Sequence, residues 1–126
     1  MPDVGTFRID FEVENPQRPG ERSDVTNALV DTGSELAWIP GRILESLGIS
    51  RIKLWHFRQA DGTALERWAG FAYVYAEGLS TADEVIFGEP GDMILFGDRT
   101  LEGLNLRVDA HRKILVDAGP APAACA

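Results

Sequence analysis

The residues best placed for chemistry are Asp31, Thr32 and Gly33, which follow directly behind the apolar triplet at residues 28–30. Such a triplet is typical of a strand interior covered on both faces, so the sequence puts a carboxylate at the end of a buried strand. No basic residue stands beside Asp31 in the sequence to neutralise it. A carboxyl group in such a place can act as a general acid or base. The alternative is an ordinary turn, because Asp and Gly both favour turns.

The elements before and after this triplet have clear local signals. Apolar and polar residues alternate over residues 6–14, which predicts a strand with one buried face and one solvent-exposed face. The prolines and glycine of residues 15–20 predict a turn, so a return strand then leads into Asp31. Behind the triplet, Pro40 suits a first helical position and Gly48 suits a C-terminal cap. We therefore expect a short helix over residues 40–47.

A long hairpin is predicted in the middle of the chain. Residues 52–59 and 65–75 are rich in aromatic and β-branched side chains, and the segment between them contains Asp-Gly, a strong hairpin signal. The predicted tip consists of Ala60, Asp61, Gly62 and Thr63.

Short elements fill the rest of the chain. We expect a strand over residues 81–87, an apolar run at 93–96 stopped by Gly97, a helical turn that buries Leu101 and Leu104, and a last hairpin over residues 106–117. Many short strands with one or two short helices predict an all-β, closed, β-barrel-like architecture. This domain spans residues 1–118, and residues 119–126 are predicted to form a tail.

The stretch ALVDTGSELAWIPGRILESLGI resembles the active-site segment of retropepsin-like aspartic proteases (clan AA, the retroviral type). In that family an apolar strand precedes Asp-Thr/Ser-Gly-Ala/Ser, and Ile-Pro opens a helix. Residues 59–63 stand where the family carries its flap, and residues 93–97 with Leu101 are similar to its apolar-apolar-Gly segment. Residues 106–116 resemble the terminal hairpin of the bacterial, retrotransposon and DNA-damage-inducible branches. The resemblance implies one lobe per chain, in the bacterial single-domain branch.

The chemistry agrees with this resemblance. Peptide hydrolysis by carboxyl groups needs one carboxylate to take a proton from water and one carboxylic acid to polarise the carbonyl. The chain has one Asp-Thr-Gly, so the economical source of the second acid is an identical chain across a two-fold axis. We therefore expect a homodimeric aspartic endopeptidase with Asp31 as the catalytic residue and a peptide or unstructured protein as substrate.

The resemblance also implies roles for the neighbours of Asp31. Thr32 would hydrogen-bond across to the other subunit, Gly33 would leave space for backbone amides to approach the carboxylates, and Ser34 would support the loop. Ala60, Asp61, Gly62 and Thr63 would form a flap that closes over a bound peptide. The alternative for the flap is an ordinary surface hairpin. Residues 97–100 read Gly-Asp-Arg-Thr, whereas many retropepsins place arginine straight after the glycine, so we expect a different supporting contact there.

Other candidates for chemistry are weaker. Ser34 as a nucleophile would need a histidine base, and the two histidines, His56 and His111, stand in separate strand or turn contexts. Four acids, Asp83, Glu84, Glu89 and Asp92, show no metal-ligand spacing and are predicted to form a solvated acidic edge. We therefore expect no metal ion and no cofactor. Trp38 is near enough to Asp31 in sequence to line a subsite.

Charge and composition narrow the partners. The 126 residues carry a net charge of −8, which disfavours nucleic acid and anionic membranes. The first ten residues lack the apolar core of a signal peptide, and no apolar run approaches the length of a membrane span, so we expect a cytoplasmic protein. The single cysteine, Cys125, can form no internal disulfide, which fits a reducing compartment but equally fits a residue without a role, and we favour the latter interpretation.

Two rival functions remain open at this point. One is a catalytically silent retropepsin-like module that dimerises or holds an extended peptide by strand addition. The other is an unrelated small β domain, monomeric in solution, in which Asp31 is a turn residue.

Overall fold

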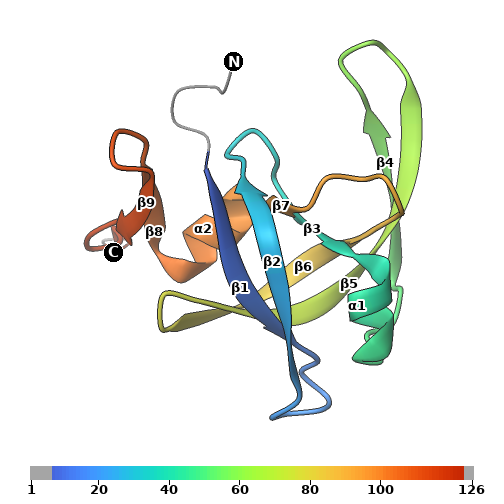
Figure 1. The fold of residues 1–126 in the computed structure, drawn as a ribbon, viewed down its shortest axis with the longest axis horizontal. Helices are drawn as coiled ribbons and strands as arrows, with labels where there is room; N and C mark the ends of the chain where they lie inside the picture. Colours follow the sequence, from blue (N-terminus) through green and yellow to red (C-terminus); the bar gives the residue numbers. More distant parts are fainter. Residues whose placement is uncertain (1–6, 124–126) are drawn as a thin grey trace.

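The computed structural model describes residues 7–123, which fold mainly into strands with two short helices (Figure 1). In chain order the elements are β1 (Arg8–Glu14), β2 (Arg22–Val30), β3 (Ala37–Pro40), α1 (Gly41–Ser46), β4 (Lys53–Arg58), β5 (Ala64–Ala76), β6 (Leu79–Gly88), β7 (Leu95–Phe96), α2 (Asp98–Leu104), β8 (Leu106–Asp109) and β9 (Ile114–Asp117). Thr6 and Cys125 lie outside the described residues. Among residues 7–123, no helix has the length and apolar character needed to cross a membrane.

Seven of the strands form one sheet in the order β1-β2-β7-β3-β6-β5-β4. β1 also pairs with β5, through Glu12 opposite Tyr75 and its neighbours, so the pairings close a circuit from β1 round to β5. β4 is the outer strand beyond this circuit, and β8 with β9 forms a separate hairpin. The main hydrophobic core lies inside the circuit and includes Val13, Val25, Ile39, Val74, Val85 and Phe96.

The elements with strong local signals form as predicted, and the mainly β fold class is confirmed. In β1 the alternation buries Phe11 and Val13. The predicted central hairpin is β4 and β5, and its tip contains Gly62 at φ +89°, a conformation that favours glycine. The short helix α2 buries Leu101 and Leu104.

Two predicted elements differ in their bounds. The first helix begins at Gly41, because Pro40 has an extended ψ of 126° and ends the strand β3, which the sequence pattern did not predict. β3 lies parallel to β6, with Trp38 opposite Ile86, so it forms through a partner far along the chain. The apolar run at 93–96 contributes only Leu95 and Phe96 to a strand.

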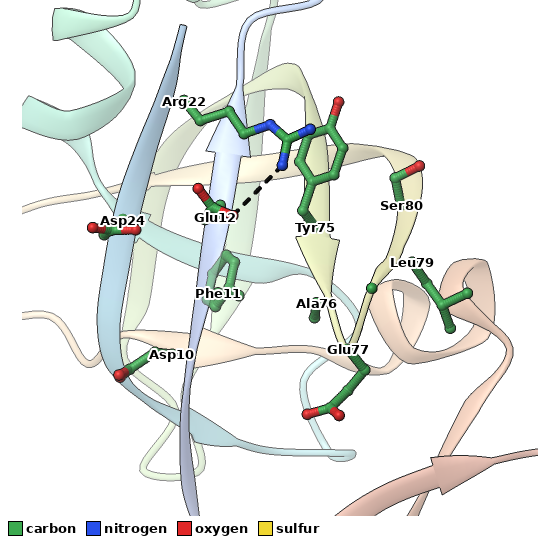
Figure 2. A pocket seen from close by; sticks show the side chains of 11 residues that line it. Asp10, Phe11, Glu12, Arg22, Asp24, Tyr75, Ala76, Glu77, Leu79 and Ser80 are labelled. Carbon is green, nitrogen blue, oxygen red and sulfur yellow. Dashed lines mark ion pairs between the residues drawn. The ribbon is translucent and has the colours of Figure 1, made fainter. Parts of the chain in front are cut away.

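A cluster of polar contacts supports the place where β1 meets β5. The Arg22 guanidinium carbon lies 3.6 Å from the centre of the Tyr75 ring, and Arg22 Nη1 lies 3.5 Å from Glu12 Oε1 (Figure 2). The Tyr75 hydroxyl and the Gly20 amide both donate to the buried Glu14 carboxylate. The Tyr75 hydrogen bond holds the pKa of Glu14 below its ordinary value. The pocket of about 460 Å³ beside this cluster lies between β1, β2 and the β5–β6 turn.

Candidate active site

Asp31 is the first residue after β2, and β7 fixes its backbone. The last two residues of β2 pair in parallel with Leu95 and Phe96, and the Asp31 amide then donates to the Phe96 carbonyl at 3.0 Å. Val30 before it is buried, whereas Asp31 itself is half-buried. The structure therefore places a carboxyl group directly after the apolar end of β2, where Ala28 and Val30 are buried and Leu29 is half-buried rather than covered on both faces.

The loop that starts at Asp31 is a tight turn held by its own carboxylate. The Gly33 amide donates to Asp31 Oδ1 at 2.9 Å, and the Ser34 amide donates to the Asp31 carbonyl at 3.2 Å. A Cβ on Gly33 would lie 3.1 Å from Asp31 Oδ1, so a side chain there would crowd the carboxylate. Thr32 is exposed, and its contact with a second subunit stays a prediction.

The beginning of α2 supports this loop from behind. The Asp98 amide donates to the Ser34 carbonyl at 2.7 Å, and the Arg99 amide donates to the Glu35 carbonyl at 2.9 Å. Arg99 also reaches the Glu35 carboxylate, with Nη2 3.3 Å from Oε2. The Gly-Asp-Arg-Thr segment thus supports the loop through two backbone amides and through the Arg99–Glu35 ion pair.

Asp31 lines a groove of about 760 Å³. One wall is aromatic: the Trp38 and Phe57 ring centres are 5.1 Å apart, and Trp55 stacks on Phe57 at 5.9 Å. Trp55 Nε1 donates to Glu84 Oε2 at 2.7 Å, which fixes its ring. Sequence reasoning placed Trp38 near Asp31 but missed Trp55 and Phe57. Their spacing of two within β4 was the available signal, because it puts both rings on one face.

The projecting hairpin, which we define as residues 53–68, carries two of these rings and bounds the groove toward its tip. Figure 1 shows this hairpin extending beyond the rest of the sheet. Of the four predicted flap residues, Ala60 lines the groove, and all four are exposed. Asp61 Oδ1 accepts the Thr63 amide at 2.9 Å, and this hydrogen bond lowers the pKa of Asp61. The structure thus brings the predicted hairpin and Asp31 to one groove.

The hydroxyl of Ser34 is engaged with the backbone. Ser34 Oγ donates to the Leu36 carbonyl at 2.8 Å, which favours the supporting role over a nucleophilic one. His56 lines the same groove, but its Nδ1 lies 3.4 Å from Glu66 Oε1. His111 is exposed in the turn between β8 and β9.

The prediction of a solvated acidic edge is wrong for three of its four members. Asp83, Glu84 and Asp92 are half-buried and accept hydrogen bonds from Thr100, Trp55 and Arg67 respectively, while Glu89 is exposed. These partners come from elements that only the fold brings together. Within the described part of the chain, no group of three or more acidic, histidine or cysteine side chains could hold a metal ion.

We expect Asp83→Asn to stabilise the protein at neutral pH. Burial raises the pKa of Asp83, although the Thr100 hydrogen bond opposes this, so its ionised form is costly in the folded state above that pKa. The cost disappears as the pH falls through the raised pKa, and the two proteins should then converge in stability. Urea unfolding from pH 7 to pH 3 measures this. A variant less stable than the parent at pH 7 would contradict it.

Comparisons with known proteins show the fold. No family model matches the chain, and no curated protein matches it. Among solved structures, the chain is similar to the solution structure of the simian foamy virus (mac) protease, with a TM-score of 0.51 and 17% sequence identity. The match covers 76% of this chain and 92% of the viral one. At this identity the similarity shows a retropepsin-like fold.

Proposed function

We propose that this protein is an aspartic endopeptidase that acts as a homodimer, with Asp31 of each chain forming the catalytic pair. The observation that carries the proposal is the position of Asp31. It follows the apolar end of β2, which pairs with β7, in a retropepsin-like fold, and it lines a groove bounded by a projecting hairpin. The bacterial branch and a cytoplasmic location stay predictions from the sequence.

A second copy would complete the chemistry. Two carboxyl groups within hydrogen-bonding reach cannot both ionise cheaply, so the pair holds one proton and titrates as a unit, as is known for the dyads of aspartic proteases. The ionised member takes a proton from water, and the protonated member donates to the peptide carbonyl oxygen. Half-burial of Asp31 in the single chain leaves the carboxylate accessible to a partner and to substrate.

The groove suits an extended peptide. Its aromatic wall offers apolar contact area to the side chains of a peptide, and Ala60 at the hairpin tip lines the same groove. A mobile hairpin that closes over a bound peptide would exclude water from the reaction. An unstructured protein segment fits such a groove better than a folded domain, because an extended backbone can follow it.

The second candidate is a silent module that holds peptides without cutting them. The observation that favours it is the position of β4, which is the outer strand of the sheet and offers an edge for strand addition. The two candidates share the fold and differ in turnover.

Cleavage in the presence of a transition-state mimic separates the candidates. We expect an unstructured protein to be cut faster at acidic pH than at neutral pH. We also expect a peptide that carries a hydroxyl in place of the scissile carbonyl to inhibit this cleavage, with an affinity at least ~100-fold higher than that of a matched substrate. Mass spectrometry of the fragments and inhibition curves measure both. Peptide binding with no turnover between pH 3 and pH 8 would establish the module instead.

A further inference from the structure

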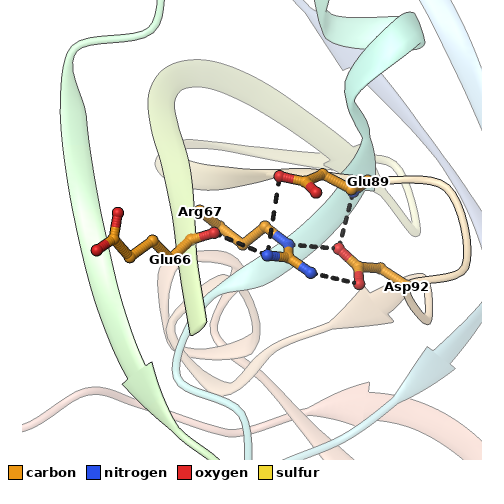
Figure 3. A network of polar contacts seen from close by, with 4 residues as sticks. All are labelled: Glu66, Arg67, Glu89 and Asp92. Atoms are coloured by element: carbon orange, nitrogen blue, oxygen red, sulfur yellow. Dashed lines mark hydrogen bonds and ion pairs between the residues drawn. The ribbon is translucent and has the colours of Figure 1, made fainter. Parts of the chain in front are cut away.

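Arg67 in β5 makes the most extensive side-chain ion pair near the groove, with residues of the β6–β7 loop (Figure 3). Its Nε and Nη2 donate to the two carboxylate oxygens of Asp92 at 2.7 and 2.9 Å, and Nη1 lies 3.8 Å from Glu89 Oε2. The side chains of Arg67 and Asp92 are only 16% and 19% exposed. A bidentate ion pair that is largely shielded from solvent fixes the relative orientation of the two side chains as well as the distance between them.

This pair lies where the projecting hairpin leaves the sheet. β5 pairs with β6 from Ala69 onward, whereas residues 64–68 pair with β4. Arg67 therefore stands two residues beyond the Ala69–Ile86 pair, within the part of β5 that projects. The Arg67–Asp92 ion pair therefore joins the projecting part of β5 to the β6–β7 loop at the point where the hairpin leaves the sheet.

Asp92, the acidic member of this ion pair, is linked to Asp31 through the β6–β7 loop and β7. Asp92 Oδ2 also accepts the Glu89 amide at 2.8 Å, so the same carboxylate shapes the loop that leads into β7. β7 then holds Asp31 through the Phe96 carbonyl. Arg67 also lies over one ring of the aromatic wall, with its guanidinium carbon 5.9 Å from the centre of the Trp38 ring.

We propose that Arg67 is a positioning residue, whose pairing with Asp92 sets the angle of the projecting hairpin over the Asp31 groove and thereby the affinity for extended substrate. The inference rests on the proposed peptidase function. Arg67 takes no part in bond breaking. The Arg67 hydrogen bond holds the pKa of the Asp92 carboxyl below its ordinary value.

The first test variant removes the bidentate contact between Arg67 and Asp92 but keeps the positive charge at position 67. We expect Arg67→Lys to raise KM for a peptide substrate about tenfold and to leave kcat within about twofold, because lysine cannot reproduce the fork of an arginine. Asp92→Asn should act similarly, and the double variant should be no worse than either single one if the two residues act as a pair. The matched control is Arg22→Lys, which alters an arginine that pairs with an acid and covers an aromatic ring, but beside a different pocket.

Hydrogen exchange gives a readout that needs no activity. The projecting hairpin should exchange its amides at least about threefold faster in Arg67→Lys than in the wild type or in Arg22→Lys. A fall in kcat and in the unfolding midpoint with KM unchanged would overturn the inference and leave Arg67 a structural residue. If the wild type cuts no peptide, the proposed function fails, and hydrogen exchange alone tests the role of Arg67. Faster amide exchange in the projecting hairpin of Arg67→Lys would then support the positioning role, and unchanged exchange would overturn it.

Discussion

Replacing Asp31 by asparagine should abolish peptide cleavage and leave the fold and the dimer intact. The asparagine carbonyl oxygen can still accept the Gly33 amide that Asp31 Oδ1 accepts at 2.9 Å, so the loop keeps its shape. An amide cannot take a proton from water at the pH of the reaction, so kcat should fall by at least ~10²–10⁴-fold. Cleavage of an unstructured protein, together with sedimentation equilibrium, measures activity and assembly in the same samples.

The chain offers a matched control for this substitution. Asp117 begins a second Asp-x-Gly turn, in which Oδ1 accepts the Gly119 amide at 3.1 Å, and it lies in β9. Asp117→Asn therefore makes the same chemical change in a similar local turn, and we expect activity close to that of the parent. Cleavage by Asp31→Asn at the parental rate would show that another residue is catalytic. A protein that stays monomeric at all concentrations would refute the shared dyad.

Gly97→Ala should destabilise the protein by about 2–3 kcal/mol and lower activity per folded molecule. A Cβ at Gly97 would lie 2.5 Å from the Leu36 carbonyl oxygen and 3.0 Å from the Ala37 amide nitrogen, and both are backbone atoms. The φ of −91° suits any residue, so the cost is steric. To relieve this clash, α2 must move away from the loop that follows Asp31. The amides of Asp98 and Arg99 hold that loop in place, so the movement should disturb it.

Gly78→Ala separates this steric effect from a general loss of stability. Gly78 has a φ of +74°, and a Cβ there would meet nothing within 4 Å, so the variant should lose about 1 kcal/mol through backbone strain alone. Its kcat per folded molecule should match the parent. Urea unfolding gives the free energies of unfolding, and initial rates at equal folded concentration give kcat. If Gly97→Ala folds and cuts like the parent, the close approach of α2 to Leu36 is wrong.

The sequence by itself determined the parts of the fold that depend on neighbours in the chain. Alternation identified β1, the Asp-Gly pair located the projecting hairpin, and Gly48 marked the end of α1 with a φ of +75°. The position of Asp31 directly after the apolar triplet at residues 28–30 was also visible. Each of these signals reflects a preference of the local backbone or the burial period of a single element, and such preferences need no distant partner.

Only the tertiary structure decided what surrounds Asp31. β3 and β7 are short strands that exist because β6 and β2 lie beside them, and their residues carry no period that would reveal this. The aromatic wall unites β3 with β4, and Arg67 meets Asp92 across a separation of 25 residues. Contacts of this kind form only when the whole sheet closes, because their free energy comes from burial and pairing between distant segments. The sequence thus located the candidate catalytic acid, and the closed circuit of strands selected the groups that line its groove.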